Sequence, residues 1–157
     1  MRIWIDADGC PREVKEIVFR ASERLKVSVC LVANAPLAVP KCPLVSFLLV
    51  PHGLNVADSH IAEGVAVEDI VVTADVPLAA LVVKRGAVAI DPRGSPYTEE
   101  TIGRQLASRD LLHSLRSREV IRGGGPPALG AKDVQRFASA LDKWLTKKLK
   151  KGQEPSQ

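Results

Sequence analysis

The chain begins with an apolar strand that leads directly into a helix start. Ile3-Trp4-Ile5 is followed by Asp6-Ala7-Asp8-Gly9-Cys10, and Pro11 has the fixed φ that suits the first position of a helix. In open α/β sheets, ligands bind just beyond the carboxyl ends of the strands. These residues therefore favour an α/β fold with a ligand site after its first strand.

Strand and helix patterns alternate along the rest of the chain. Short continuous apolar runs predict strands that are buried on both faces, at residues 3–5, 27–33, 44–50, 69–74 and 87–90. Apolar residues at helical spacing predict helices over residues 11–25, 56–65, 77–84, 102–115 and 134–145. Strands that alternate with helices predict a three-layer fold, in which helices flank a mostly parallel central sheet.

The length and composition fit one domain. A chain of 157 residues can bury a proper core, and we expect one domain over residues 1–150 with a flexible tail at 151–157. No uncharged stretch approaches the about 20 residues that a membrane span needs, and the start lacks a signal-peptide layout. We therefore expect a cytoplasmic protein without membrane contact. The net charge of +4 is concentrated in a lysine-rich run near the C-terminus, which is typical of a solvated helix end.

Acidic residues gather where the predicted strands end. In a parallel sheet, right-handed crossovers bring Asp6, Asp75 and Asp91 to the same edge. Asp8 lies two residues after Asp6, so both would point the same way if the strand persisted. Two bare carboxylates about 4 Å apart repel by about 4 kcal/mol at an effective dielectric near 20. A divalent cation, a shared proton or a basic side chain must offset this repulsion.

Each acidic residue also has a structural interpretation. Asp6 could simply end its strand, while Asp8 caps the following helix. Two aspartates at this position favour a site, and hard cations such as Mg²⁺ or Mn²⁺ prefer such oxygen ligands. Arg12, in the first helical turn, and Arg93, after a strand end, are placed to contact phosphate. Cys10 is interpreted as a packed thiol, and Thr73 as a residue that holds the turn at Asp75.

Four segments make a resemblance specific. They are Asp-Ala-Asp-Gly-Cys-Pro at 6–11, Val-Ala-Asp-Ser-His-Ile at 56–61, Thr-Ala-Asp-Val-Pro-Leu-Ala at 73–79 and Asp-Pro-Arg-Gly at 91–94. Together they resemble the YaiI/YqxD family of uncharacterised bacterial proteins, also called UPF0178 or DUF188. That family is similar to PIN-like and NYN domains, which are metal-dependent ribonucleases on a compact α/β sheet.

The resemblance implies a fold, a metal site and a substrate. It implies one PIN-like domain that binds Mg²⁺ or Mn²⁺ and hydrolyses a phosphodiester, in RNA. Asp6 matches the first metal-binding aspartate of the PIN pattern, Asp58 the acidic residue of the central helix, and Asp75 the aspartate after the fourth strand. Asp8 is an added ligand. Asp6, Asp8 and Asp75 would serve catalysis, and Arg12 and Arg93 would contact the RNA backbone.

Two other classes of function stay open. Ile-Asp-Ala-Asp-Gly also resembles the opening motif of haloacid-dehalogenase-type phosphatases, with Asp6 as nucleophile and Asp8 as general acid/base. Lys84 is available for that chemistry, but no Gly-Asp-x-x-x-Asp element follows. The other class is a non-catalytic RNA- or partner-binding protein that keeps the acidic residues without turnover. No feature of the sequence points to a particular oligomeric state.

Overall fold

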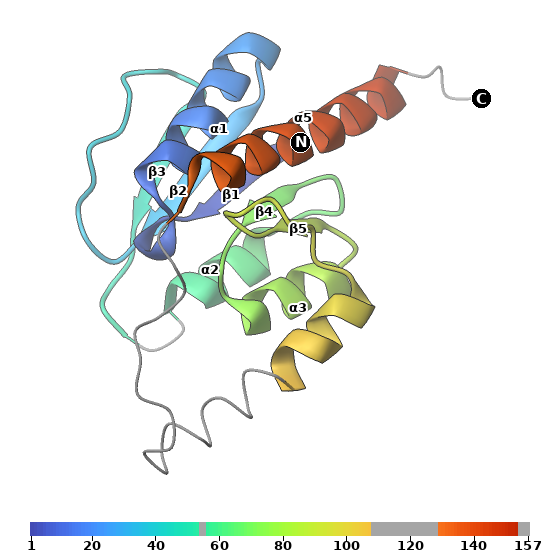
Figure 1. The fold of residues 1–157 in the computed structure, drawn as a ribbon. Helices are drawn as coiled ribbons and strands as arrows, with labels where there is room; N and C mark the ends of the chain where they lie inside the picture. Colours follow the sequence, from blue (N-terminus) through green and yellow to red (C-terminus); the bar gives the residue numbers. More distant parts are fainter. Residues whose placement is uncertain (54–55, 108–128, 154–157) are drawn as a thin grey trace.

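A computed structural model of the chain describes residues 1–53, 56–107 and 129–153. Its centre is a parallel sheet of five strands in the order β3-β2-β1-β4-β5 (Figure 1). The strands are β1 (Arg2–Asp6), β2 (Ser28–Ala33), β3 (Val45–Leu49), β4 (Ile70–Val72) and β5 (Val88–Ile90). The first strand along the chain thus lies at the centre of the sheet, between two neighbours that bury it.

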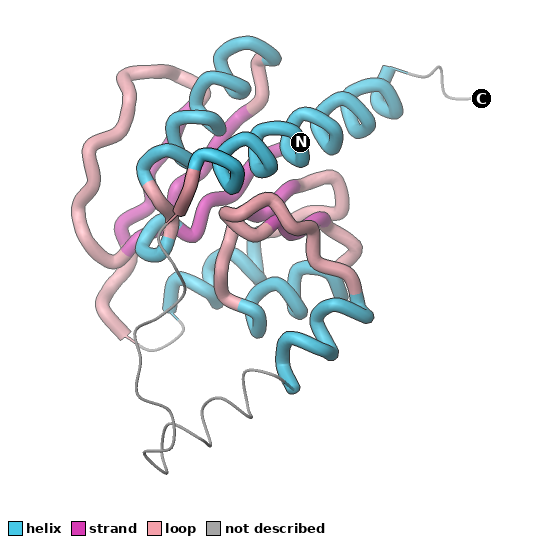
Figure 2. Tube along the Cα trace, viewed as in Figure 1, coloured by secondary structure: helices cyan, strands magenta, loops and turns pink. Residues whose placement is uncertain are grey.

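Helices cover both faces of the sheet. They are α1 (Arg12–Leu25), α2 (Val56–Gly64), α3 (Val76–Lys84) and α5 (Ala131–Gln153), with further helical turns over residues 99–107. α1 and α5 lie side by side on one face, and α2 and α3 lie on the other (Figures 1 and 2). The predicted three-layer α/β fold with a parallel central sheet is therefore confirmed.

Alternation along the strands builds a separate core on each face. Ile3 and Ile5 pack with α1 and α5, whereas Trp4 packs with α2 and α3. Successive strand residues point to opposite faces, so Asp6 is on the same face as Trp4. The carboxylate at the end of β1 therefore lies on the side of the sheet that α2 covers.

A glycine lets α2 lie directly on the central strand. A Cβ at Gly64 would come within 2.7 Å of the Trp4 ring, which is closer than side chains pack. Ile61 and Ala62 are buried in the same core. With its last residue held against Trp4, α2 is placed so that its first turn, with Asp58, meets the end of β1.

The strand register sets which residues meet beyond the sheet. Ile5 pairs with Val72 in β4, and Val72 pairs with Ile90 in β5. The next residues, Asp6 and Thr73, therefore come side by side at the carboxyl edge, as the parallel arrangement requires.

Two details differ from the sequence expectations. β1 ends at Asp6, and a short 3-10 helix, η1 (Ala7–Gly9), follows, so strand alternation does not carry as far as Asp8. α5 runs over Ala131–Gln153, whereas the apolar spacing predicts a helix over residues 134–145. Residues 108–115 of the helix expected over 102–115, and residues 154–157 of the expected tail, lie outside the described residues. No helix within the described ranges is long and apolar enough to cross a bilayer.

Candidate functional site

A cavity of about 310 Å³ opens at the carboxyl edge of the sheet. The residues that line it are Asp6, Asp8, Gly9, Asn34, Gly53, Val56, Ala57, Asp58 and Asp75. Four of these are aspartates, and this lining contains no lysine, arginine or histidine within the part of the chain that the structure describes. The structure thus brings together all four carboxylates that the sequence predicted as metal ligands, and we call this cavity the acidic pocket.

Asp6 is held at the pocket by Thr73. The Thr73 hydroxyl donates a hydrogen bond of 3.0 Å to Oδ2 of Asp6, and Thr73 itself is almost fully buried. Burial raises the pKa of Asp6, the Thr73 hydrogen bond lowers it, and the nearby Asp75 and Asp8 charges raise it further. The net shift is upward, so the pocket resists ionisation of Asp6 in the absence of a cation.

Asp75 is positioned by its role as a helix cap. Its Oδ1 accepts a hydrogen bond of 3.0 Å from the backbone N–H of Leu78 at the start of α3. Its own backbone N–H donates to the Thr73 hydroxyl across 3.0 Å, which is the turn-holding contact expected of Thr73. The cap uses Oδ1, and it fixes the side chain with the carboxylate at the pocket wall.

Asp58 has the most strongly perturbed carboxyl in the pocket. Partial burial, the charges of Asp75 and Asp6, and a hydrogen bond with Asp75 raise its pKa from 3.8 to about 6. Such a hydrogen bond between two carboxyl groups requires a proton on one of them. Near neutral pH, the pocket therefore holds its negative charge at a free-energy cost that a bound cation would relieve.

Asp8 reaches the pocket through the turn after β1. Both of its oxygens accept from the backbone N–H of Asn34, at 3.0 and 3.3 Å, and Asn34 follows β2. Pro11 is the N-cap residue of α1, without a side-chain cap hydrogen bond, so Asp8 does not cap that helix. Asp8 instead links the ends of two neighbouring strands at the rim of the pocket.

The oxygens of the pocket suit a hydrated hard cation. In the described parts of the chain, no three His, Cys, Asp or Glu side chains are already gathered closely enough to enclose one ion. Mg²⁺ commonly uses one or two carboxylates and keeps several of its waters, so it does not need such a cage. The oxygen donors of the pocket fit such an ion, and Asp6 and Asp75 are the residues that could hold it.

The two arginines predicted to bind substrate do not line the acidic pocket. Arg12 lies on α1 and pairs with Glu16 at 3.2 Å. Arg93 pairs with Asp133 of α5 at 2.9 Å, which ties the turn after β5 to the outer helix layer. The contacts of both arginines with phosphate stay predictions. The ion pair with Asp133 gives Arg93 a structural role as well.

Asp91 and Tyr97 form a supporting layer beside the pocket. Asp91 accepts from the backbone N–H of Arg93 at 2.7 Å and does not line the cavity. The Tyr97 hydroxyl lies 3.2 Å from both Thr73 O and Asp91 Oδ2, and burial followed by the Asp91 charge raises the pKa of Tyr97. Sequence reasoning missed Tyr97, whose only signal was that a polar-tipped aromatic residue closely follows a strand end.

The thiol beside the site is inert in this environment. Cys10 is buried, and this burial, with a smaller effect from Asp6, raises its pKa to about 12. Only the thiolate is a good nucleophile or metal ligand. The expected structural role of Cys10 therefore agrees with its surroundings.

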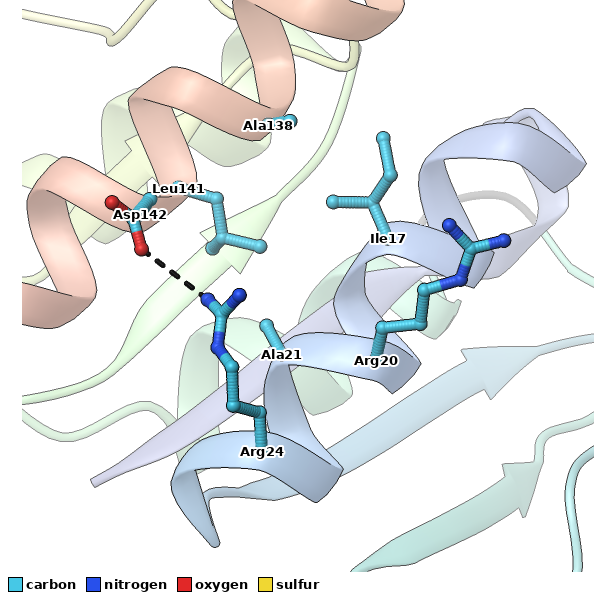
Figure 3. Close-up of a pocket in the computed structure, with 7 residues that line it drawn as sticks. All are labelled: Ile17, Arg20, Ala21, Arg24, Ala138, Leu141 and Asp142. Carbon is cyan, nitrogen blue, oxygen red and sulfur yellow. Dashed lines mark hydrogen bonds and ion pairs between the residues drawn. The ribbon is translucent and has the colours of Figure 1, made fainter.

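A separate hollow of about 320 Å³ lies between α1 and α5, on the other side of the sheet (Figure 3). Arg24 of α1 pairs there with Asp142 of α5 at 3.3 Å, and Ile17, Ala21 and Leu141 contribute apolar groups to its lining (Figure 3). Both charged partners are well exposed, so this hollow is a surface groove between two packed helices. It has none of the converging carboxylates of the acidic pocket.

The fold and the pocket define a three-layer α/β protein with a carboxylate site at the carboxyl edge of a parallel sheet. Residues 4–147 match the family model described as "Uncharacterized BCR, YaiI/YqxD family". The chain belongs to this family, also named UPF0178.

Full-length relatives agree with that assignment. A UPF0178 protein of Geobacter sulfurreducens is 58% identical over 96% of this chain and 100% of its own length. A UPF0178 protein of Trichlorobacter lovleyi is 53% identical over 98% of this chain and 99% of its own length. A third, from Cronobacter sakazakii, is 49% identical over 93% and 96% of the two chains. No solved structure matches the chain.

Proposed function

We propose that this protein is a metal-dependent phosphodiester hydrolase that acts on RNA. The observation that carries the proposal is the acidic pocket, in which four aspartates from β1, η1, α2 and the cap of α3 face one open cavity without a basic partner in its lining. A pocket of this charge repels an RNA phosphate unless a cation is present. The same arrangement is what metal-assisted phosphoryl transfer uses.

The position of each aspartate suggests its role in metal binding. Asp6 and Asp75 would hold Mg²⁺ or Mn²⁺, with Asp8 and Asp58 assisting through water. The bound ion supplies positive charge that offsets the carboxylates and the charge developing on the phosphate. Thr73 orients Asp6 through its hydroxyl, while the α3 cap orients Asp75.

The proposal is tested by cleavage of a labelled single-stranded RNA with Mn²⁺. We expect cleavage that EDTA abolishes and that Asp75→Asn lowers at least about a hundredfold, comparable to loss of one strong electrostatic contact. Asn still caps a helix, so this variant should fold. Asp142→Asn, at the exposed groove between α1 and α5 on the other side of the sheet, is the matched control and should cleave like the parent. RNA binding that survives EDTA, without cleavage by any preparation, would instead indicate a binding protein.

A dehalogenase-type phosphatase is the enzymatic alternative, and Asp6-Ala7-Asp8 at the end of β1 favours it. That mechanism requires a lysine close to the nucleophile. Lys84 lies in the last turn of α3, at the opposite end of that helix from Asp75. Its position therefore does not favour the phosphatase. Beryllofluoride separates the two mechanisms because it forms an adduct on a phosphorylatable aspartate. We expect no adduct on Asp6, and an adduct there would favour the phosphatase.

A further inference from the structure

A second hollow, of about 590 Å³, lies between the first half of α1 and the loop that follows β2. Its charged lining comes from the exposed side of α1, and its apolar lining comes from that helix and the loop. The lining includes Arg12, Lys15, Phe19, Leu37, Val39 and Pro40. We call this hollow the basic–apolar pocket.

Both walls of the basic–apolar pocket begin at the acidic pocket. Gly9 lines the acidic pocket, and Arg12 follows three residues later at the start of α1. Asn34 also lines the acidic pocket, and Leu37 follows three residues later in the loop. The hydrogen bond between Asn34 N–H and Asp8 joins the two walls at this shared end. The loop leaves β2 near the start of α1 and lines the hollow together with that helix (Figure 1).

The two pockets have complementary chemistry. The acidic pocket presents carboxylates, whereas Arg12 and Lys15 bring two cationic side chains to the basic–apolar pocket beside one carboxylate, Glu16. Phe19 is half-buried, with the partly buried side chains of Leu37 and Val39 also lining the hollow. Cationic side chains beside an aromatic ring and aliphatic groups suit a nucleotide, which carries a phosphate and a flat base.

We propose that the basic–apolar pocket holds the nucleotide next to the scissile phosphate of a single-stranded RNA. This rests on the proposed function, because it places the reacting phosphate in the acidic pocket. The base packs on Phe19 between α1 and the loop, and Arg12 and Lys15 contact the adjoining phosphate. An unpaired strand is required because a base within a duplex cannot enter a hollow of this kind.

Photo-crosslinking locates the nucleotide independently of cleavage. The probe is a short single-stranded RNA with one 4-thiouridine, irradiated with the full chain in Ca²⁺ and in Mn²⁺, followed by peptide mapping. We expect crosslinks on the peptides that contain Phe19 or residues 37–40. Crosslinks confined to other peptides, or no binding of RNA, would overturn the proposal.

Substitutions then test the contacts. Lys15→Ala and Phe19→Leu should each weaken RNA binding, measured by fluorescence anisotropy, by about fivefold or more, since both remove a phosphate or stacking contact. Leu keeps most of the apolar volume at position 19, and thermal melting checks that the variant folds. Arg20→Ala is the control, because Arg20 is an exposed cation on the same helix that lines the separate groove between α1 and α5 and is not in the lining of the basic–apolar pocket. It should bind RNA like the parent.

The failures of the two proposals can be told apart. RNA that crosslinks to Phe19 or residues 37–40 but is never cleaved would support the basic–apolar pocket and contradict hydrolysis. RNA that is cleaved with an unchanged KM by both Lys15→Ala and Phe19→Leu would support hydrolysis and overturn the basic–apolar pocket.

Discussion

Thr73 donates its hydroxyl hydrogen to Asp6 across 3.0 Å, from the end of β4 to the end of β1. The same oxygen accepts from the backbone N–H of Asp75 at 3.0 Å. One buried hydroxyl therefore joins the two carboxylates that we propose as direct metal ligands. Because the Tyr97 hydroxyl lies 3.2 Å from the Thr73 carbonyl oxygen, the whole group is anchored to the segment after β5.

The Thr73 contacts predict a loss of stability on Thr73→Val. Valine has nearly the same shape but leaves the Asp75 N–H and one Asp6 oxygen without this partner. We expect the free energy of unfolding to fall by about 1–3 kcal/mol, the usual consequence of leaving a buried polar group unsatisfied. Urea titration measures the change. Thr73→Ser keeps the hydroxyl and should retain most of the stability, and equal losses in the two variants would contradict this role of the hydroxyl.

Asp58 predicts a pH dependence in metal-free protein. Its pKa is raised to about 6 in the folded chain, above the 3.8 of the unfolded chain, so the folded state binds more protons between these values. The contribution of Asp58 to stability must therefore fall as pH rises from about 4 to about 6 and stay low above that range. After allowance for solvent screening, we expect a loss of about 1 kcal/mol.

The measurement compares urea unfolding of the parent and Asp58→Asn in EDTA at several pH values. Asparagine does not titrate, so the variant should gain about 1 kcal/mol over the parent as pH passes from 4 to 7. Glu63→Gln, an exposed change on the same helix, is the control and should track the parent. If the difference in unfolding free energy between Asp58→Asn and the parent stayed constant with pH, the raised pKa of Asp58 would be contradicted.

A divalent cation should stabilise the folded chain. An ion that binds only the folded state adds about 1.4 kcal/mol at ten times its Kd, which corresponds to about 4 °C in the Tm of a domain of this size. We expect such a rise with millimolar Mn²⁺ and a smaller one in Asp6→Asn, which removes one ligand charge. In EDTA, Asp6→Asn should melt no lower than the parent, because burial and the neighbouring aspartates oppose ionisation of Asp6. An unchanged Tm of the parent in Mn²⁺ would count against an ion site.

Much of the site could be predicted because strand ends in a parallel sheet share an edge. Asp6 and Asp75 follow from their positions after apolar runs, and the register then places Thr73 beside Asp6. Asp58 is placed at the pocket only by the family resemblance. Its distance from the end of β1 depends on how closely Gly64 lets α2 lie on Trp4. Such a packing distance between distant residues has no local signal in a sequence.

Other parts depend on contacts that local patterns do not encode. Strand alternation predicts that Asp8 points the same way as Asp6, but β1 ends at Asp6, and Asp8 reaches the pocket through η1 and the Asn34 N–H. Arg93 was predicted from its strand-end position, but Asp133 lies 40 residues away in the sequence, so their ion pair could not be anticipated. The basic–apolar pocket arises from the path of a proline-rich loop beside α1, which composition alone does not determine.

Gly94 provides a test of how the turn after β5 meets α5. Its φ of +94° lies in the left-handed region that residues with a Cβ avoid. A Cβ there would also lie 2.6 Å from both the Arg136 carbonyl carbon and the Phe137 nitrogen, which are backbone atoms that cannot move aside cheaply. Gly94→Ala should therefore lower the free energy of unfolding by at least about 2 kcal/mol, from backbone strain and overpacking together.

The control for Gly94→Ala is Gly103→Ala, within the helical turns of residues 99–107. A Cβ at Gly103 would meet nothing within 4 Å, and alanine favours a helix by about 1 kcal/mol over glycine, so this variant should be at least as stable as the parent. Both variants keep all four aspartates of the acidic pocket, so each should still gain Tm in Mn²⁺. If Gly94→Ala unfolded at the same urea concentration as the parent, the close approach of the turn to α5 would be wrong. Loss of the Mn²⁺ effect with retained stability would instead mean that this turn supports the acidic pocket directly, through the Asp91–Tyr97–Thr73 contacts.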